Sequence, residues 1–292
     1  MSLCNLCPRK CNTDRSVSKG FCRVSDNLTA AKACLHFWEE PCIAGYGGAG
    51  TVFFSGCNLG CVYCQNREIS RGGTGKEITV DRLREIFEEL IYQGADTIDL
   101  VTPTHYSDLI AEALRAEKLP VPVVYNTGSY ETAEALKNLE GLVDIYLPDY
   151  KYADAALAEK LSFAPDYPEV AFAAIREMYR QTGDYVLDNE GMLQRGVMIR
   201  HLVLPGHIGN TLDCLDRLTS VFSDSNVLFS LMSQYTPPKT PLPYPELNRR
   251  LSEEEYGEAV DYLYLCGIEN GFVQELSSAK EEYTPDFDLT GV

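Results

Sequence analysis

The chain has 292 residues, of which 45% are hydrophobic and 23% are charged, so it is long enough for one large soluble domain. Its 25 basic and 43 acidic residues give a net charge of −18, which repels phosphate backbones and argues against a nucleic-acid partner. No apolar run approaches about 18 residues and no leader pattern opens the chain, so we expect a cytoplasmic protein with no membrane contact.

The first part of the chain is rich in cysteine. The sequence has 11 cysteines, and in the cytoplasm such thiols stay reduced, so their clustering indicates metal binding rather than disulfides. Cys4, Cys7, Cys11 and Cys22 lie within residues 1–50. Four thiolates suffice for a closed zinc site or for a second iron–sulfur cluster, and the sequence leaves both open. Alternatively, these thiols pack as small hydrophobic groups.

The next element is a short apolar strand that ends in three cysteines. Residues 51–54 are β-branched or aromatic, and Cys57, Cys61 and Cys64 follow with the spacing C-x3-C-x2-C. Thiolates this close in one loop can converge on one soft metal centre. A closed structural site takes four protein ligands, whereas a site that performs chemistry keeps a position open, so three cysteines favour chemistry. A zinc knuckle or three unligated thiols are the alternatives.

This spacing, with Tyr63 directly before the last cysteine, resembles the signature of the radical S-adenosylmethionine (SAM) superfamily. The continuation Cys64-Gln-Asn-Arg is similar to the activating enzymes of glycyl radical enzymes, of the pyruvate formate-lyase activating enzyme and PflX-like kind. Segments 38–42 and 102–105 extend the resemblance. It implies a 4Fe–4S cluster on the three cysteines, with S-adenosyl-L-methionine at the open iron. Such a cluster is oxygen-sensitive, so we expect an anaerobic setting.

Beyond the motif, strand-like and helix-like segments alternate, which predicts βαβ units with parallel strands. The predicted strands are 51–55, 97–101, 121–125, 142–147, 197–204, 227–232 and 271–275. The predicted helices are 80–93, 105–117, 130–138, 153–163, 167–181, 208–222 and 252–267. The resemblance implies an α/β fold, a partial (β/α)6 TIM-like radical SAM barrel with a cysteine-rich N-terminal extension.

The predicted organisation has three parts. Residues 1–50 form a cysteine-rich metal-binding extension, 51–276 the radical SAM core, and 277–292 a tail that crosses the barrel opening or its edge. Residues 184–196 form a hairpin that either covers the site as a lid or only decorates the barrel.

The carboxyl ends of the strands carry the candidate polar residues, because function sits there in such barrels. Many superfamily members have Gly-Gly-Glu after the second strand, where this chain has Thr102, Thr104 and His105. Any of these three side chains could replace that contact, although His105 could equally pack in a loop. After the third strand, Asn126 and Thr127 place short polar side chains at the barrel mouth.

The fourth strand ends in Asp149 and Lys151, similar to an Asp-x-Lys segment of the activating enzymes. The resemblance implies that they hold the amino and carboxylate groups of SAM, whereas the plain alternative is a surface ion pair. In the fifth strand, alternation lets only one of Arg200 and His201 point into the barrel, and we expect Arg200 to pair with the cofactor carboxylate. By resemblance, Tyr63 lies near the adenine, and Asn66 helps hold the amino-acid end.

These features predict a radical SAM oxidoreductase. The cluster cleaves SAM reductively, and the 5′-deoxyadenosyl radical that results abstracts hydrogen from a substrate. The first hypothesis is activation of a glycyl radical enzyme, with a flavodoxin or ferredoxin as the reductant. The second is radical modification of another protein, a peptide or a small metabolite. A third class, a non-enzymatic interaction protein, predicts zinc on Cys57, Cys61 and Cys64.

Overall fold

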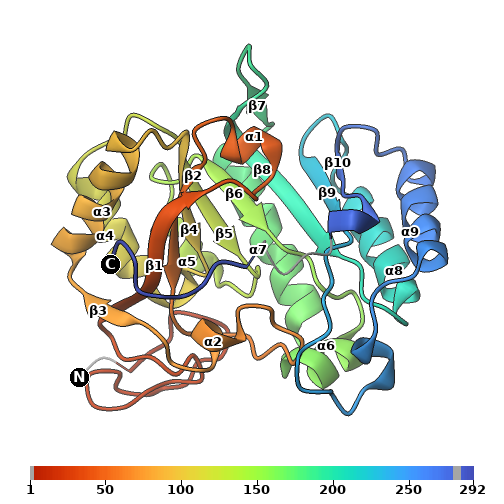
Figure 1. The fold of residues 1–292 in the computed structure, drawn as a ribbon, viewed down its shortest axis with the longest axis horizontal. Coiled ribbons are helices and arrows are strands. Elements are labelled where there is room, and N and C mark those ends of the chain that lie inside the picture. Colours follow the sequence, from red (N-terminus) through yellow and green to blue (C-terminus); the bar gives the residue numbers. More distant parts are fainter. Residues whose placement is uncertain (1–2, 279–283) are drawn as a thin grey trace.

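The computed structural model describes residues 3–278 and 284–292 (Figure 1). The strands are β1 (Leu28–His36), β2 (Ala49–Phe54), β3 (Lys76–Ile78), β4 (Thr97–Val101), β5 (Val123–Thr127), β6 (Ile145–Pro148), β7 (Val186–Leu187), β8 (Leu193–Leu202), β9 (Leu228–Met232) and β10 (Gly271–Val273). The α-helices are α1 (Pro41–Ala44), α2 (Arg67–Ser70), α3 (Val80–Tyr92), α4 (Ser107–Ala116), α5 (Ala133–Lys137), α6 (Ala155–Ser162), α7 (Tyr167–Thr182), α8 (Ile208–Thr219) and α9 (Glu253–Leu265). The 3-10 turns are η1 (Thr104–Tyr106), η2 (Pro245–Asn248) and η3 (Leu276–Ser278).

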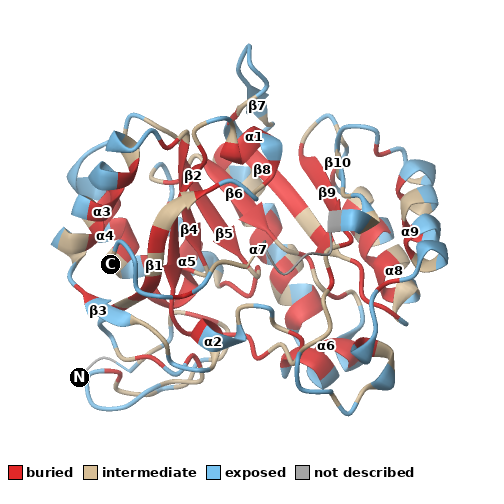
Figure 2. Cartoon of the chain, in the orientation of Figure 1, coloured by how far each residue is buried: buried red, intermediate tan, exposed pale blue. Residues whose placement is uncertain are grey.

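One sheet organises the molecule, with the strand order β10-β9-β8-β6-β5-β4-β2-β1-β3. All neighbours from β2 to β10 are parallel, whereas β1 pairs antiparallel with both β2 and β3. Strands β2, β4, β5, β6 and β9 are buried along their whole length, because helices cover the sheet (Figure 2). The path ends at two different edge strands, so the barrel is open, and the predicted partial (β/α)6 barrel is confirmed.

Four of the nine α-helices of the described chain begin at a side chain that caps them, Thr79, Thr132, Asp154 and Ser252. The Thr79 hydroxyl accepts from the backbone N–H of Arg82 at the start of α3. Ser252 and Glu255 form a capping box at the start of α9. The predicted strands and long helices all appear, within a few residues of their expected bounds.

Strand β1 was not predicted. Its sequence is rich in alanine and has no clear alternation, so its extended form comes from pairing rather than from its own composition. It pairs with β2 along one side, and the C-terminal segment contacts it as well. There the N–H of Ala33 donates to the carbonyl of Thr290 (2.9 Å), and the N–H of Leu289 donates to Ala31 (3.1 Å). Part of the cysteine-rich segment is thus built into the sheet.

The hairpin of β7 and β8 forms as predicted, with Val186 opposite Arg195. It projects at the opposite end of the molecule from α2, which directly follows the cysteine loop (Figure 1). A lid over the strand ends is therefore wrong, and the hairpin decorates the far end of the barrel. In the described part of the predicted tail, Thr284 and Pro285 line a cavity at the barrel opening, while residues 279–283 lie outside the described residues.

Among the described residues, none of the helices has both the length and the apolar character needed to cross a bilayer.

Candidate active site

The loops that leave the parallel strands meet at one cavity of ≈ 240 Å³. Because the carboxyl ends of parallel strands share one edge of the sheet, residues distant in sequence come together there. The predicted residues that line it are Cys57, Cys61, Tyr63, Cys64, Asn66, Thr102, Thr104, Asn126, Thr127, Asp149, Lys151 and Arg200. The structure therefore gathers the three motif cysteines and the predicted cofactor residues around the same space.

The cysteine loop is shaped by one glycine and by hydrogen bonds to sulfur. Gly56 has φ +86°, a conformation that other residues rarely adopt, and it turns the chain at the end of β2. The Ser162 hydroxyl donates to Cys61 Sγ (2.9 Å), and Ser70 Oγ lies 3.4 Å from Cys64 Sγ. The backbone N–H of Leu59 contributes a contact to Cys57 Sγ (3.4 Å). Such donors stabilise thiolates.

The three thiols fit a positively charged metal centre. Burial, together with the neighbouring Cys61 and Cys64, raises the pKa of Cys57 to about 12, because three thiolates at one site repel one another. Metal ligation removes this penalty by supplying the opposite charge. Within the described chain, no three Cys, His, Asp or Glu side chains surround one point as the ligands of a single ion do. In a cubane cluster, by contrast, each cysteine binds a different iron.

Arg200 is the centre of the charged network. It lies on β8 and donates from Nε to Asp149 Oδ1 (2.9 Å), from Nη1 to Glu39 Oε2 (3.1 Å) and from Nη2 to Asn126 Oδ1 (2.7 Å). Lys151 Nζ donates to the other oxygen of Asp149 (2.6 Å). These side chains are 12–18% exposed, so the pairs are shielded from water rather than lying on the surface.

The pKa shifts of the ionisable groups around the cavity indicate which of them are charged. Burial would raise the pKa of Asp149, but Arg200 and Lys151 outweigh it and hold the pKa below its ordinary value. Burial would lower the pKa of Arg200, but the carboxylates of Asp149 and Glu39 outweigh it and raise the pKa. Burial raises the pKa of Glu40, whose Oε1 accepts from Ser230 (2.6 Å). The cavity therefore holds a balanced set of fixed charges, which suits a zwitterionic ligand.

His201 faces away from this cavity, as the strand alternation requires. Its ring nitrogens contact the Tyr150 carbonyl (2.6 Å) and the Thr211 hydroxyl (2.9 Å), on the helix side of β8. Burial lowers its pKa to about 4, so the ring is neutral at pH 7.

The segment after β4 differs from one expectation. His105 cannot replace the missing Gly-Gly-Glu contact, because its Nε2 contacts the carbonyl of Ser55 (2.7 Å) and it does not line the cavity. Thr104 reaches the cavity wall, but its hydroxyl donates to the buried carboxylate of Glu131 (2.5 Å). Thr102 lines the cavity with a left-handed backbone, φ +59°. Among the described residues, the Thr102 hydroxyl makes no side-chain hydrogen bond, so of the three candidates Thr102 is the one that remains to contact a ligand.

The sequence analysis missed three acidic residues of the barrel interior. Glu39 and Glu40 line the cavity from the segment after β1, and Asp99 lies fully buried in β4 with Thr51 Oγ1 3.5 Å away. Burial and the nearby Glu39 raise the pKa of Asp99 well above its ordinary value. A signal for Asp99 was present, since an acid in the middle of an apolar strand needs a special environment. For Glu39 and Glu40 the only signal was that segment 38–42 extends the family resemblance, which assigns neither residue a role.

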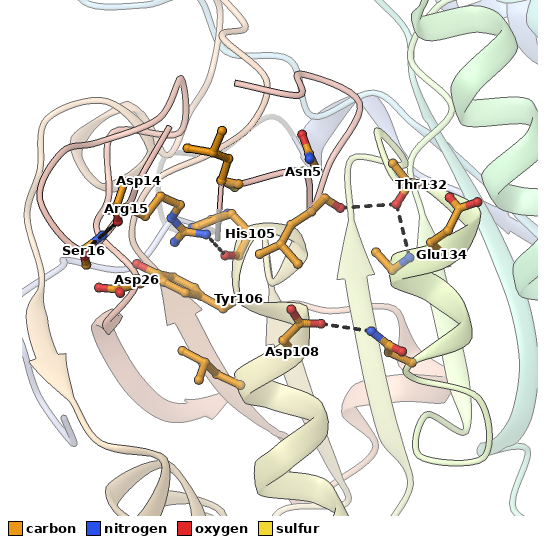
Figure 3. Close-up of a pocket in the computed structure, with 16 residues that line it drawn as sticks. Asn5, Asp14, Arg15, Ser16, Asp26, His105, Tyr106, Asp108, Thr132 and Glu134 are labelled. Carbon is orange, nitrogen blue, oxygen red and sulfur yellow. Dashed lines mark hydrogen bonds between the residues drawn. The ribbon is translucent and has the colours of Figure 1, made fainter. Parts of the chain in front are cut away.

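Two further cavities adjoin the barrel. One, of ≈ 580 Å³, runs from Tyr63 and Cys64 between the proline-rich segment 236–242 and residues 284–287. The other, of ≈ 590 Å³, lies between the N-terminal segment, α4 and α5, and none of the motif cysteines lines it (Figure 3). There Arg15 points toward His105, donating to its carbonyl (2.7 Å). The first cavity opens onto the site, and the second belongs to the N-terminal segment.

Residues 51–207 match the model of the radical SAM superfamily. The uncharacterized protein MJ0674 of Methanocaldococcus jannaschii is 29% identical over 274 residues, which cover 88% of this chain and 73% of that protein. The 7-carboxy-7-deazaguanine synthase of Methanothermobacter thermautotrophicus is 33% identical over 114 residues, covering 38% of this chain and 42% of that enzyme.

Among solved structures, Streptococcus suis SuiB bound to its precursor peptide SuiA has a TM-score of 0.55 at 15% identity, covering 77% of this chain and 48% of SuiB. SuiB bound to S-adenosylmethionine has a TM-score of 0.53 at 12% identity, covering 77% of this chain and 50% of SuiB. This chain thus spans about half of SuiB, and the likeness is one of fold. Because the family model covers more than half of the chain, including the strand that ends in the three cysteines, the chain belongs to the radical SAM superfamily.

Proposed function

We propose that the protein is an oxidoreductase that cleaves S-adenosyl-L-methionine reductively and uses the product to abstract hydrogen from a protein substrate. Membership of the superfamily implies a 4Fe–4S cluster and SAM. The observation that carries the proposal is the single cavity that Cys57, Cys61 and Cys64 share with Asp149, Lys151 and Arg200. When bound, the cluster supplies the electron that splits SAM into methionine and a 5′-deoxyadenosyl radical.

The residues of the chain bind and orient the cofactor. Asp149 carries a negative charge beside two cations, so it suits the ammonium group of the methionine end. Lys151 and Arg200 suit the carboxylate, and Asn126 and Asn66 offer amides for the remaining polar atoms. Tyr63 is buried at the junction of the two cavities and presents a ring for the adenine.

The substrate side is the ≈ 580 Å³ cavity that starts at Tyr63 and Cys64. Its walls are the segments 236–242 and 284–287, which contain several prolines and therefore resist closing onto the space. A cavity of this size, lined by Cys64 of the motif, suits an extended chain segment. This supports activation of a glycyl radical enzyme, in which a backbone glycine of the partner loses hydrogen, with a flavodoxin or ferredoxin as electron donor.

A second candidate is radical modification of a peptide or a small metabolite. It is favoured by the fold shared with SuiB, whose structure holds a precursor peptide, and by the similarity to 7-carboxy-7-deazaguanine synthase. The two candidates differ in where the radical goes. Activation leaves a stable organic radical on a partner protein, visible by electron paramagnetic resonance (EPR), whereas modification leaves a changed peptide or metabolite.

The test is anaerobic reconstitution with iron and sulfide, followed by reduction in the presence of SAM. We expect 5′-deoxyadenosine by liquid chromatography in the parent protein and none in Cys61→Ala. Cys266→Ala is the matched control, because Cys266 follows α9 and lines none of the cavities described above. Product in Cys61→Ala, or none in the parent once a reduced cluster is present, contradicts the proposal.

A further inference from the structure

The four N-terminal cysteines come together, although residues 3–27 form no helix or strand. Cys4, Cys7, Cys11 and Cys22 all line one small cavity within the N-terminal segment. A Cβ added to Gly20 would lie 3.5 Å from Cys11 Sγ and 3.6 Å from Cys22 Sγ, so both sulfurs approach the same glycine. Such a gathering of thiols requires a cause, because the segment has too few apolar residues to fold by burial.

The backbone of this segment is folded around the thiols. The N–H of Cys4 donates to Thr13 (2.9 Å), and the N–H of Asn12 donates back to Cys4 (3.2 Å), which brings the two ends of the first loop together. The N–H of Phe21 donates to Cys11 Sγ (3.3 Å). Donation from a backbone N–H to sulfur stabilises a thiolate and is the arrangement that metal-binding loops use.

The segment is also attached to the motif loop itself. The N–H of Cys57 donates to the carbonyl of Cys22 (3.3 Å), so one peptide hydrogen bond joins the two sets of cysteines. Arg9 Nε donates to the carbonyl of Asn58 (2.8 Å), and its guanidinium lies 3.9 Å from the centre of the Phe21 ring. Arg71 bridges the same two segments, donating to the carbonyls of Phe21 (2.9 Å) and Leu59 (2.6 Å).

We propose that Cys4, Cys7, Cys11 and Cys22 hold a second iron–sulfur cluster, which passes single electrons to the cluster on Cys57, Cys61 and Cys64. The relay rests on the proposed function, whereas the metal site does not. One electron enters from an iron–sulfur or flavin protein, resides on iron of the N-terminal cluster and moves to iron of the motif cluster. No bond forms or breaks, and the cysteines stay ligated as thiolates throughout.

One observation favours a cluster over a zinc ion. The Cys57–Cys22 hydrogen bond places the two sets side by side, which a structural zinc ion would not need but an electron relay does. Free buried thiols are the remaining alternative, and they predict no metal at all.

The test removes one set of cysteines at a time. Variant A is Cys57→Ser with Cys61→Ser and Cys64→Ser, and variant B is Cys4→Ser with Cys7→Ser and Cys11→Ser. After anaerobic reconstitution, we expect each variant to keep about half of the parent's iron and sulfide, and Cys34→Ser to keep all of it. If variant A contains no metal after reconstitution, or contains one zinc ion per chain, the proposed N-terminal cluster site is overturned. A cluster in variant A with no SAM cleavage by the parent overturns the proposed function and the relay but not the site.

The relay has its own measurement, the rate at which the motif cluster is reduced. By rapid-freeze EPR, we expect reduced flavodoxin to reduce this cluster at least tenfold more slowly in variant B than in the parent, with dithionite equally fast in both. Equal rates with flavodoxin overturn the relay. Circular dichroism shows whether variant B is folded. If variant B is unfolded, the single variant Cys11→Ser, which retains three of the four thiols, is used in its place.

Discussion

The guanidinium of Arg200 on β8 and the carboxylate of Asp149 at the end of β6 lie 2.9 Å apart and are joined by a parallel bridge. This pair connects two strands at the edge where the cofactor residues gather. It also leaves the guanidinium with donors for Glu39 and Asn126, so one side chain orients three others. The geometry of the cavity therefore depends on Arg200 more than on any of its partners.

Arg200→Met should lower the free energy of unfolding by about 3 kcal/mol, because it leaves Glu39 and Asp149 buried without their shared cation. SAM affinity should fall about tenfold or more through the loss of a charge-assisted donor. Urea unfolding and equilibrium dialysis measure the two effects. Arg195→Met is the matched control, since Arg195 is exposed on the same strand, and its unfolding free energy should change by less than about 0.5 kcal/mol. Equal behaviour of the two variants contradicts the central position of Arg200.

Gly56→Ala should destabilise the protein and reduce its iron content. An added Cβ would lie 2.7 Å from the carbonyl of Cys22, in a backbone with φ +86°. Gly94→Ala separates the two causes, because Gly94 has φ +100° and open space around its Cβ position. We expect Gly94→Ala to lower the free energy of unfolding by about 1 kcal/mol, through the backbone conformation alone. Gly56→Ala should lower it by at least twice as much. Iron content should fall only in Gly56→Ala, and an unchanged content there counts against the contact.

Ser162→Ala should make the reduction potential of the motif cluster more negative. The Ser162 hydroxyl donates to Cys61 Sγ (2.9 Å), and its oxygen lies 2.7 Å from Tyr152 Oη. Hydrogen bonds to ligand sulfur favour the reduced state. The measurement is an EPR redox titration of the signal that SAM perturbs. Ser70→Ala should shift the potential less, because its contact to Cys64 is longer (3.4 Å). A potential unchanged by Ser162→Ala would remove this explanation.

The apoprotein should lose stability as the pH falls from about 6.5 toward 4, partly through His201. Burial lowers the pKa of His201 to about 4 in the fold, against about 6.5 when unfolded, so the unfolded chain binds the extra proton in this window. The contribution is complete above pH 6.5 and amounts to up to about 3 kcal/mol. His201→Gln should therefore flatten the acid side of the unfolding curve, whereas His207→Gln, at a half-buried site, should flatten it less. Identical slopes for parent and His201→Gln would contradict this assignment.

The sequence predicted the parallel part of the fold well, because strands such as 97–101 and 227–232 are mostly apolar and amphipathic helices separate the strands. It also predicted that only one of Arg200 and His201 points into the barrel, because neighbouring side chains of a strand lie on opposite faces. These are local patterns, and local patterns determine which face of an element is buried.

What the sequence could not predict depends on pairing across long separations. Strand β1 is extended because β2 and the C-terminal segment hydrogen-bond to it, and its own residues show no such preference. Glu39 and Glu40 enter the barrel because β1 and β2 carry their connecting segment to its interior. For His105, the identity of the residue gave no means of choosing between a cavity wall and a packed loop, and the contact with Ser55 decides it.

The hairpin of β7 and β8 has a practical consequence for work on this protein. Segments near both termini are engaged, since Cys4 belongs to the N-terminal thiol group and Thr284 and Pro285 form a wall of the barrel opening. The turn at Asp188–Gly191 is exposed and projects far from these regions (Figure 1). An affinity epitope inserted after Asn189 would therefore permit purification and surface immobilisation with both groups of cysteines and the cavities at the barrel opening left unobstructed.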